Sequence, residues 1–505
     1  MKITRMFKEI IANIEGPHIR LRYFILIFAS SMTLRNFLEI FSDKANVPFQ
    51  LLSEKTMAFF AANYSLAISF AHYYIFWIFT FLALSLLFSW ITKTGILLVL
   101  KALFACSLII IITPLFDLLI TSGRGIEIAY AHPKSLLDLF PLPKIVTPGM
   151  LVTSLTAAVL SFSYCALKTK KWLLGLLAAA ALYALMICLA ALPVIIKATH
   201  PLPIIRILSI GIFLELAVIL FLSKPVYARA YLGQLRWLRL SYYLAMFFLG
   251  ISIARAGFFA SLMNNLPCLV LTAIAFILSW LGAVMLNDVE DYEIDLITNK
   301  ERPLVKNIFS KTQLQDISLW LFLAACVFAA AVNFTTLFFT ALLISSSCVY
   351  SLRPLRLRRV PVFSKSLIAL NSLFLVILGW LFAGQDILQF PKTIVLYFMV
   401  FVTLAANLID LKDCNGDRQA GLKTLPVIIG MEKARLLNGI FILAAYSAAG
   451  FVLLDKYILV AGICAGLLQL FLITRKDYRE TPVLLTNLCA IIILLFYLNS
   501  PFWLR

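Results

Sequence analysis

Apolar residues along this chain are gathered into long blocks separated by short polar segments. Blocks of about 20 residues, the length an α-helix needs to cross a bilayer, recur from Arg22 to the C-terminus. The pattern predicts fifteen membrane-spanning helices, at residues 21–40, 67–91, 96–120, 148–167, 172–195, 204–223, 241–260, 268–286, 317–332, 334–350, 367–384, 393–410, 436–454, 457–474 and 481–499.

The composition agrees with this pattern. Hydrophobic residues make up 62% of the 505 positions and charged residues only 13%, and no soluble domain of this size could bury so much apolar side chain. We therefore expect an all-α, polytopic membrane protein. The basic, amphipathic start of the chain has no short apolar core followed by a small-residue cleavage site, which indicates a retained cytoplasmic segment. The nine cysteines are scattered, so neither a disulfide framework nor a zinc site is expected.

The basic residues fall mainly between the apolar spans. A net charge of +19 would suggest nucleic acid in a soluble protein. Here the position of the charges indicates a role in topology and contact with anionic membrane lipids or phosphates instead. With a cytoplasmic N-terminus every inner segment is basic, for example residues 168–171, residues 353–359 and the loop expected after Asp410. This topology puts both acidic segments described below on the cytoplasmic face.

The basic connector at residues 223–240 is the best internal boundary, because it separates six predicted helices from nine. We expect an N-terminal membrane module of unknown role, residues 1–222, and a second domain, residues 223–505. Two acids of the module, Asp117 and Glu215, lie within spans or at their ends, where acids are rare and often functional. Asp117 is near enough to the outer boundary to reach water. Glu215, nearer mid-span, could pair with a neighbour, line a polar cavity or contact a ligand.

Negative charge is concentrated at the inner end of one predicted span. Five of the 24 acidic residues lie in the segment NDVEDYEID, from Asn287 to Asp295. On one continuous helix Asn287, Asp291 and Asp295 share a face. Glu290 and Glu293 lie off that face and are expected to be solvated. Like charges about 4 Å apart repel by about 4 kcal/mol in a partly dry site, and oxygen ligands without His or Cys select Mg²⁺.

A second acidic segment, NLIDLKDCNGDRQAGLKTLPVIIG, occupies residues 407–430. Asp410, Asp413 and Asp417 have the spacing i, i+3, i+7, again at the inner end of an apolar span. Two facing acidic helix ends could hold two or more Mg²⁺ ions that bridge a strongly anionic ligand. A diphosphate meets that need, because Mg²⁺ prefers a few carboxylates together with substrate phosphate oxygens.

Arginine-rich segments accompany the two acidic segments. They are YSLRPLRLRRV, residues 350–360, and NKERPLVK, residues 299–306. Arginine makes bidentate contacts with phosphate oxygens and keeps its charge. Acids that hold metal, metal that holds diphosphate and arginines that contact the remaining oxygens would form one electrostatic assembly, and the adjacent apolar helices could take a hydrocarbon tail.

Together these motifs resemble those of the UbiA superfamily of intramembrane prenyltransferases. NDVEDYEID matches the family's N-D-x-x-D-x-x-x-D, and the segment from Asp410 matches its D-x-x-D-x-x-x-D followed by Gly and Thr-Leu-Pro. The resemblance covers about residues 235–505. It implies a nine-helix bundle that transfers a prenyl group from an allylic polyprenyl diphosphate to a lipid, quinone-precursor or other hydrophobic acceptor.

The resemblance also implies roles for individual residues. Mg²⁺, the expected cofactor, would be bound by Asn287, Asp288, Asp291, Asp295, Asp410, Asp413 and Asp417. The expected catalytic residues among these are Asp291, Asp295, Asp413 and Asp417. The diphosphate or the acceptor would be contacted by Arg302, Tyr350, Arg353, Arg356 and Lys423. The chain departs from the family in having no proline after Arg239, and residues 1–222 match nothing in the family pattern.

Other interpretations stay open at this point. Each acidic segment could be a solvated cap at the cytoplasmic end of a helix, although two such segments beside an arginine-rich loop favour a site. A transporter or channel could use the acids as a cation path, which would require acids spread through the depth of the bilayer. Residues 1–222 could bind a protein or lipid partner, gather the acceptor or modify the product.

Overall fold

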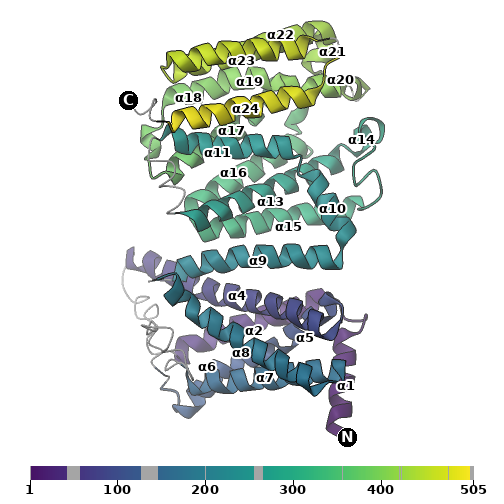
Figure 1. Cartoon of the computed structure of the whole chain (residues 1–505), viewed down its shortest axis with the longest axis vertical. Coiled ribbons are helices and arrows are strands. Elements are labelled where there is room, and N and C mark those ends of the chain that lie inside the picture. The colour runs from purple at the N-terminus through teal and green to yellow at the C-terminus, as the bar shows by residue number, and fades with distance from the viewer. Residues whose placement is uncertain are drawn as a thin grey trace. The chain divides into compact units, whose positions relative to one another are not determined.

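The computed structural model describes residues 2–42, 57–124, 126, 146–198, 201–254, 265–354, 356–419, 421, 423–475 and 477–500. The described chain is predominantly helical (Figure 1) and divides into two compact units, Met1–Pro225 and Val226–Arg505, here called unit 1 and unit 2. Thirteen described helices are long and apolar enough to cross a membrane. Helices α2 (Leu21–Ser42) and α11 (Trp237–Ile253) coincide with the two remaining predicted spans. The number of helices that cross the membrane stays a prediction.

Unit 1 begins with a helix of polar sequence and continues with longer, apolar helices. Its described elements are α1 (Lys2–Glu15), α2, α4 (Met57–Thr92), α5 (Ile96–Ala105), η1 (Cys106–Ile111), α6 (Ile112–Ile120), α7 (Pro148–Thr169), α8 (Trp172–Ile195) and α9 (Pro201–Ser223). The short 3-10 segment η1 joins α5 and α6 into a single span. Most of residues 121–147, between the predicted spans 96–120 and 148–167, lies outside the described residues.

Asp117 is an internal anchor of unit 1. Its side chain is only 1% exposed, so the prediction that it reaches water at the outer boundary is wrong. One carboxylate oxygen accepts a hydrogen bond from the Thr147 hydroxyl at 2.5 Å, and the other accepts from the backbone N–H of Gly149 at 2.7 Å. The carboxylate thus satisfies a free amide at the start of α7 and ties that end to α6. Glu215 lies within α9, and its role stays open.

Unit 2 consists of long helices with several short helical segments at its acidic motifs. From the boundary onward the elements are α10 (Pro225–Gln234), α11, α13 (Leu266–Glu290), α14 (Tyr292–Thr298), α15 (Lys311–Val332), α16 (Phe334–Ser351), η3 (Leu357–Arg359), α17 (Pro361–Phe382), η4 (Ile387–Gln389), α18 (Lys392–Tyr397), η5 (Phe398–Val402), α19 (Thr403–Ala405), η6 (Ala406–Ile409), α20 (Asp410–Gln419), α21 (Leu425–Ile429), α22 (Met431–Val452), α23 (Lys456–Thr474) and α24 (Glu480–Leu498).

Polar residues fix the starts of several helices in unit 2. Ser310 and Gln313 form a capping box at the start of α15. The side chain of Asn333, the single residue between α15 and α16, accepts from the backbone N–H of Thr336 at 2.7 Å. Asp455 accepts in the same way from the first turn of α23. These caps satisfy amide groups that lipid could not.

Two glycines let α11 and α17 pack backbone against backbone. A Cβ atom on Gly250 would lie 1.9 Å from the carbonyl oxygen of Val376, and one on Gly379 would lie 2.0 Å from the carbonyl oxygen of Phe247. Phe247 and Val376 are themselves fully or almost fully buried. This close approach fixes the relative position of two helices that both contribute side chains to the cavity of unit 2.

Candidate active site

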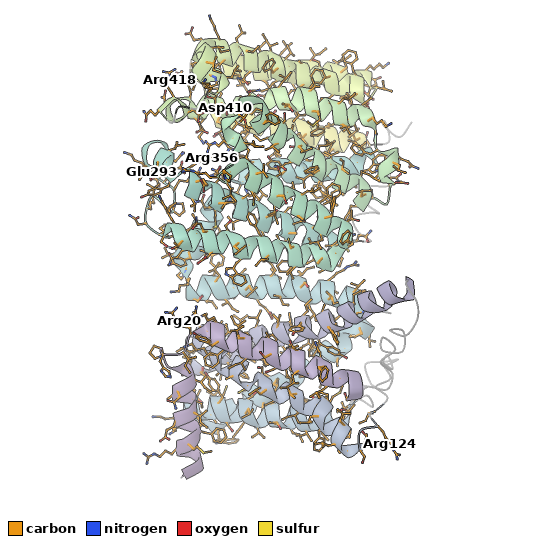
Figure 2. All side chains as sticks on the ribbon, turned by 180° about the vertical axis from the view of Figure 1, so that it is seen from behind. Arg20, Arg124, Glu293, Arg356, Asp410 and Arg418 are labelled. Carbon is orange, nitrogen blue, oxygen red and sulfur yellow. The ribbon has the colours of Figure 1, made fainter. Side chains whose placement is uncertain are left out.

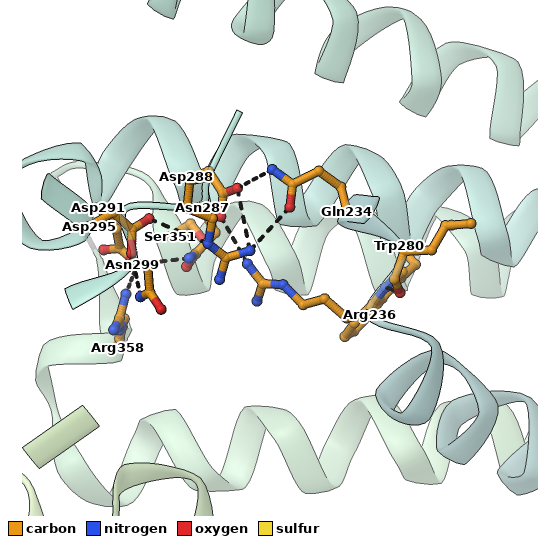
Figure 3. Close-up of polar contacts among 12 residues, drawn as sticks. Gln234, Arg236, Trp280, Asn287, Asp288, Asp291, Asp295, Asn299, Ser351 and Arg358 are labelled. Atoms are coloured by element: carbon orange, nitrogen blue, oxygen red, sulfur yellow. Dashed lines mark hydrogen bonds and ion pairs between the residues drawn. The ribbon is translucent and has the colours of Figure 1, made fainter. Parts of the chain in front are cut away.

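The first acidic motif lies at a break between two helices. α13 ends at Glu290 and α14 begins at Tyr292, with Asp291 between them. The prediction of one continuous helix through Asp295 is therefore wrong. The motif still converges, because Asn287 Nδ2 donates to Asp291 Oδ2 at 2.7 Å and the backbone N–H of Asp295 donates to the Asp291 carbonyl at 2.9 Å (Figure 3).

Arginines from the segment after α16 hold this break in place. Arg356 donates to the carbonyl oxygen of Glu290 and to Asp291 Oδ1, each at 3.1 Å. Arg358 pairs with the other carboxylate oxygen of Asp291 (Figure 3). Arg353 is 72% exposed and lies 3.6 Å from the Glu290 carboxylate, which is only 18% exposed. Glu290 is therefore paired rather than solvated, and that prediction is wrong.

Asp288 belongs to a separate group of contacts. Its carboxylate is 1% exposed and accepts from Gln234 Nε2 at 2.6 Å and from Arg236 Nη2 at 2.9 Å. Arg302 lies between this group and the rest of the motif, 3.7 Å from Asp288 and 3.9 Å from Asp295. Burial and the charge of Arg302 lower the pKa of Arg236 to about 10, which leaves it charged at neutral pH. Asp288 thus ties the α10–α11 junction to α13.

The three aspartates of the second acidic motif lie on one helix. The inner segment expected after Asp410 begins with this helix, because residues Asp410–Gln419 form α20. Asp410 and Asp417 are 8% and 3% exposed. Lys365 Nζ donates to Asp410 Oδ1 at 2.5 Å. In the described part of the chain, no basic side chain forms an ion pair with Asp413 or Asp417.

Both motifs line a single cavity of about 870 Å³ in unit 2. The predicted site residues that line it are Asn287, Asp291, Asp295, Arg302, Tyr350, Asp410, Asp413 and Asp417. Those that do not line it are Asp288, Arg353, Arg356 and Lys423. The labelled residues Glu293, Arg356, Asp410 and Arg418 lie toward the same end of the helices of unit 2 (Figure 2).

Five basic residues of the cavity wall are absent from the predicted site. They are Arg236, Arg239, Arg358, Lys365 and Lys412. Arg239 contacts Glu480 at 2.5 Å, and Lys365 is 4% exposed near the start of α17. The signal for Lys365 was a single lysine two positions before a predicted apolar span, where a lysine usually marks the membrane boundary.

Away from the acids the wall of the cavity is apolar and aromatic. It is formed largely by α11, α22, α23 and α24, through residues that include Tyr242, Met246, Ala449, Val452, Ile458 and Leu494. The cavity therefore joins a charged region to a region suited to a hydrocarbon chain.

The donor atoms at the charged end fit Mg²⁺, although they are not preassembled around one ion. The donors are carboxylate and amide oxygens, which this hard cation prefers. Within the described ranges, no three His, Cys, Asp or Glu side chains are grouped closely enough to hold a metal. Arg358 and Lys365 occupy oxygens of Asp291 and Asp410 instead. Burial raises the pKa of Asp295, and a nearby cation would favour its ionised form.

A model of the UbiA prenyltransferase family matches residues 243–496, half of the chain. The chain therefore belongs to the UbiA prenyltransferase family, and the resemblance noted in its motifs is confirmed. With its many long apolar helices it is an integral, multi-pass membrane protein.

Individual relatives cover part of the chain. The digeranylgeranylglyceryl phosphate synthase of Methanoculleus marisnigri is 30% identical over 185 residues, which are 36% of this chain and 63% of that protein. The synthase of the same name from Thermococcus kodakarensis is 28% identical over 229 residues, 43% of this chain and 80% of that protein. The chain thus spans less than two thirds of the first of these relatives. A solved UbiA homolog from Archaeoglobus fulgidus bound to GPP and Mg²⁺ is 20% identical, with a TM-score of 0.43, over 54% of this chain and 98% of that one.

Proposed function

We propose that this protein is a Mg²⁺-dependent prenyltransferase that moves a prenyl group from an allylic polyprenyl diphosphate to a hydrophobic acceptor. One observation carries the proposal: a single cavity is lined both by the two acidic motifs and by apolar helices. The diphosphate would lie among the charged side chains, and its hydrocarbon chain would lie along the apolar wall.

Different residues of the chain would bind the metal and the diphosphate. Asn287, Asp291 and Asp295 from the first motif would hold Mg²⁺, together with the three aspartates of α20. When bound, the metal supplies positive charge that stabilises the departing diphosphate. Arg302 and Tyr350 line the cavity and are candidates for diphosphate contact. The exposed side chains of Arg353 and Lys423 lie outside the cavity wall and give no support to a substrate contact.

The transfer itself breaks the C–O bond between the prenyl group and the diphosphate. A nucleophilic carbon or oxygen of the acceptor forms the new bond and loses its proton to water or to the released diphosphate. The apolar wall excludes water from the reacting carbon, which limits hydrolysis of the donor. The four histidines all precede residue 201, so no histidine of unit 2 acts as a base.

A lipid is the acceptor that the comparisons favour. The relatives described above are named for making digeranylgeranylglyceryl phosphate, a prenylated glycerol phosphate. We further propose that the acidic motifs face the cytoplasm, because the basic segments between the spans favour that orientation. Residues 1–222 would then be a module that gathers the acceptor or binds a lipid or protein partner.

The transporter interpretation is not favoured. A cation path needs acids at successive depths of the membrane. Among the described residues, every acid that lines the cavity instead belongs to one of the two motifs: Asp291, Asp295, Asp410, Asp413 and Asp417.

The test uses the purified full-length protein in lipid bilayers with Mg²⁺, prenyl diphosphates of several lengths and a membrane-lipid extract. We expect pyrophosphate release together with a lipid whose mass has increased by one prenyl group, and we expect EDTA to abolish both. Asp291→Ala and Asp413→Ala should each lower the rate by at least about 100-fold. Glu293→Ala is the matched control, since this acid of the first motif is 79% exposed and should be dispensable. Ordinary activity in Asp291→Ala or Asp413→Ala with Mg²⁺ present would rule the proposal out.

A further inference from the structure

A buried lysine occupies one carboxylate of the second motif. Lys365 and Asp410 are 4% and 8% exposed, and Lys365 Nζ lies 2.5 Å from Asp410 Oδ1. Both residues line the cavity. Among the described residues, Asp410 is the one hydrogen-bond partner of this ammonium group, which has three N–H donors. The lysine therefore brings unused donors to the wall of the cavity that we assign to the diphosphate.

The three aspartates of α20 carry more negative charge than this lysine alone neutralises. Asp410, Asp413 and Asp417 lie on one helix at intervals of three and four residues, and Lys365 forms the one ion pair to them within the described chain. A divalent cation beside these carboxylates would neutralise more charge than the lysine does. It would also repel the lysine from Asp410, because two cations cannot share that oxygen without a large electrostatic cost.

The contrast with Asp288 distinguishes this lysine from a purely structural one. Asp288 is held by two donors, Gln234 and Arg236, and does not line the cavity. Within the described chain Lys365 makes one side-chain hydrogen bond, and it has a flexible four-carbon side chain and lies on the cavity wall. Lysine binds phosphate as a movable point charge, whereas the planar fork of arginine favours one fixed geometry.

We propose, on the basis of the function proposed above, that Lys365 pairs with Asp410 in the empty site and with the substrate diphosphate in the loaded site. In the empty site it pairs with Asp410. When Asp410 turns to Mg²⁺, the ammonium is released and donates to an oxygen of the substrate diphosphate. Lys365 thus opposes metal binding when no diphosphate is present and supports it when diphosphate is present. Metal and diphosphate consequently favour each other's binding, and this coupling is reciprocal.

The experiment measures binding without turnover. Mn²⁺ binding to the full-length protein is followed by electron paramagnetic resonance, first alone and then with inorganic pyrophosphate. Lys365→Met should bind Mn²⁺ alone more tightly than the wild type, by up to about 10-fold, because the competing cation is gone. The same variant should bind pyrophosphate at saturating Mn²⁺ about 10- to 100-fold more weakly, because one charge-assisted hydrogen bond is lost.

The control for the loss of one positive charge is Lys433→Met. Lys433 is exposed on α22 and does not line the cavity, so both affinities should match the wild type. The opposite signs of the two effects identify the proposed exchange. If Lys365→Met weakens Mn²⁺ and pyrophosphate binding together, or changes neither, the proposal is overturned. Wild-type protein that binds no pyrophosphate with Mn²⁺ would overturn the proposed function as well.

A second pair of variants covers the case in which Lys365→Met does not fold. Removing the lysine alone leaves Asp410 buried without its partner, which is costly, whereas a neutral pair avoids that cost. Asp410→Asn/Lys365→Met is such a neutral pair and should therefore fold, and Asp410→Asn keeps a side-chain oxygen that can accept a hydrogen bond from Lys365. The double variant should bind Mn²⁺–pyrophosphate about 10- to 100-fold more weakly than Asp410→Asn alone. Equal affinities would contradict a role of Lys365 in diphosphate binding.

Discussion

At the scale of single residues, Asp288 and Asp291 have the same chemistry but different surroundings. Asp288 accepts hydrogen bonds from Gln234 and Arg236 and does not line the cavity, whereas Asp291 lines it. We expect Asp288→Ala to lower the free energy of unfolding by about 2–4 kcal/mol, because the charge of Arg236 loses its buried partner. The Mn²⁺ affinity of the Asp288→Ala variant should change little. Asp291→Ala should lose metal binding while losing less stability. Thermal unfolding in detergent and Mn²⁺ titration check both, and an Asp288→Ala variant that stays stable but binds no metal contradicts this division.

The same two residues show what the sequence could and could not predict about the site. The spacing of acids predicted a metal-binding face, and the two motifs included the five acidic residues listed above that line the cavity. It could not separate Asp288 from Asp291, because the partner that holds Asp288 is Arg236, some 50 positions earlier. Lys365 was missed for the same reason: its role depends on Asp410, and contact across helices leaves no local signal.

At the scale of helices, the contact between α11 and α17 depends on the absence of a side chain at Gly250. A Cβ atom there would lie 1.9 Å from a backbone oxygen. We expect Gly250→Ala to destabilise the protein by about 1–3 kcal/mol, since one helix must move. Both helices carry cavity residues, so Mn²⁺–pyrophosphate binding should weaken as well.

Gly233→Ala provides the matched control. Gly233 is also helical, on α10, and apart from its chain neighbours and the adjacent backbone of its own helix no described atom lies within 4 Å of where its Cβ would be. Alanine favours a helix over glycine by about 0.5–1 kcal/mol, so this variant should be equally stable or more stable. Thermal unfolding of both variants in detergent is the measurement. Equal melting temperatures for the two would show that the close contact does not limit stability.

Helix ends were harder to predict than helices. Each predicted span coincides with a helix, because blocks of apolar residues need no tertiary information. The break at Asp291 is different. The last carbonyl of α13, that of Glu290, accepts a hydrogen bond from Arg356, 66 positions later. The sequence showed the acidic segment and the arginine loop separately. Only the folded structure shows that an arginine of this loop contacts the last carbonyl of α13, where that helix ends.

At the scale of the whole molecule, all residues that line the cavity belong to unit 2. Unit 2 also has its own hydrophobic core, built around residues such as Phe247, Val376 and Leu378. We therefore expect residues 226–505, expressed alone, to fold and to bind Mn²⁺–pyrophosphate within about 2-fold of the full-length affinity. The measurement is the same paramagnetic titration, after circular dichroism and gel filtration have shown that the isolated unit is helical and monodisperse. Transfer to a lipid acceptor is measured in parallel by mass spectrometry. If the isolated unit 2 and the full chain bind the donor equally, any difference in their transfer rates reports the contribution of unit 1. A folded unit 2 whose affinity drops 10-fold or more would mean that unit 1 supports the charged end of the cavity, and not only the supply of acceptor.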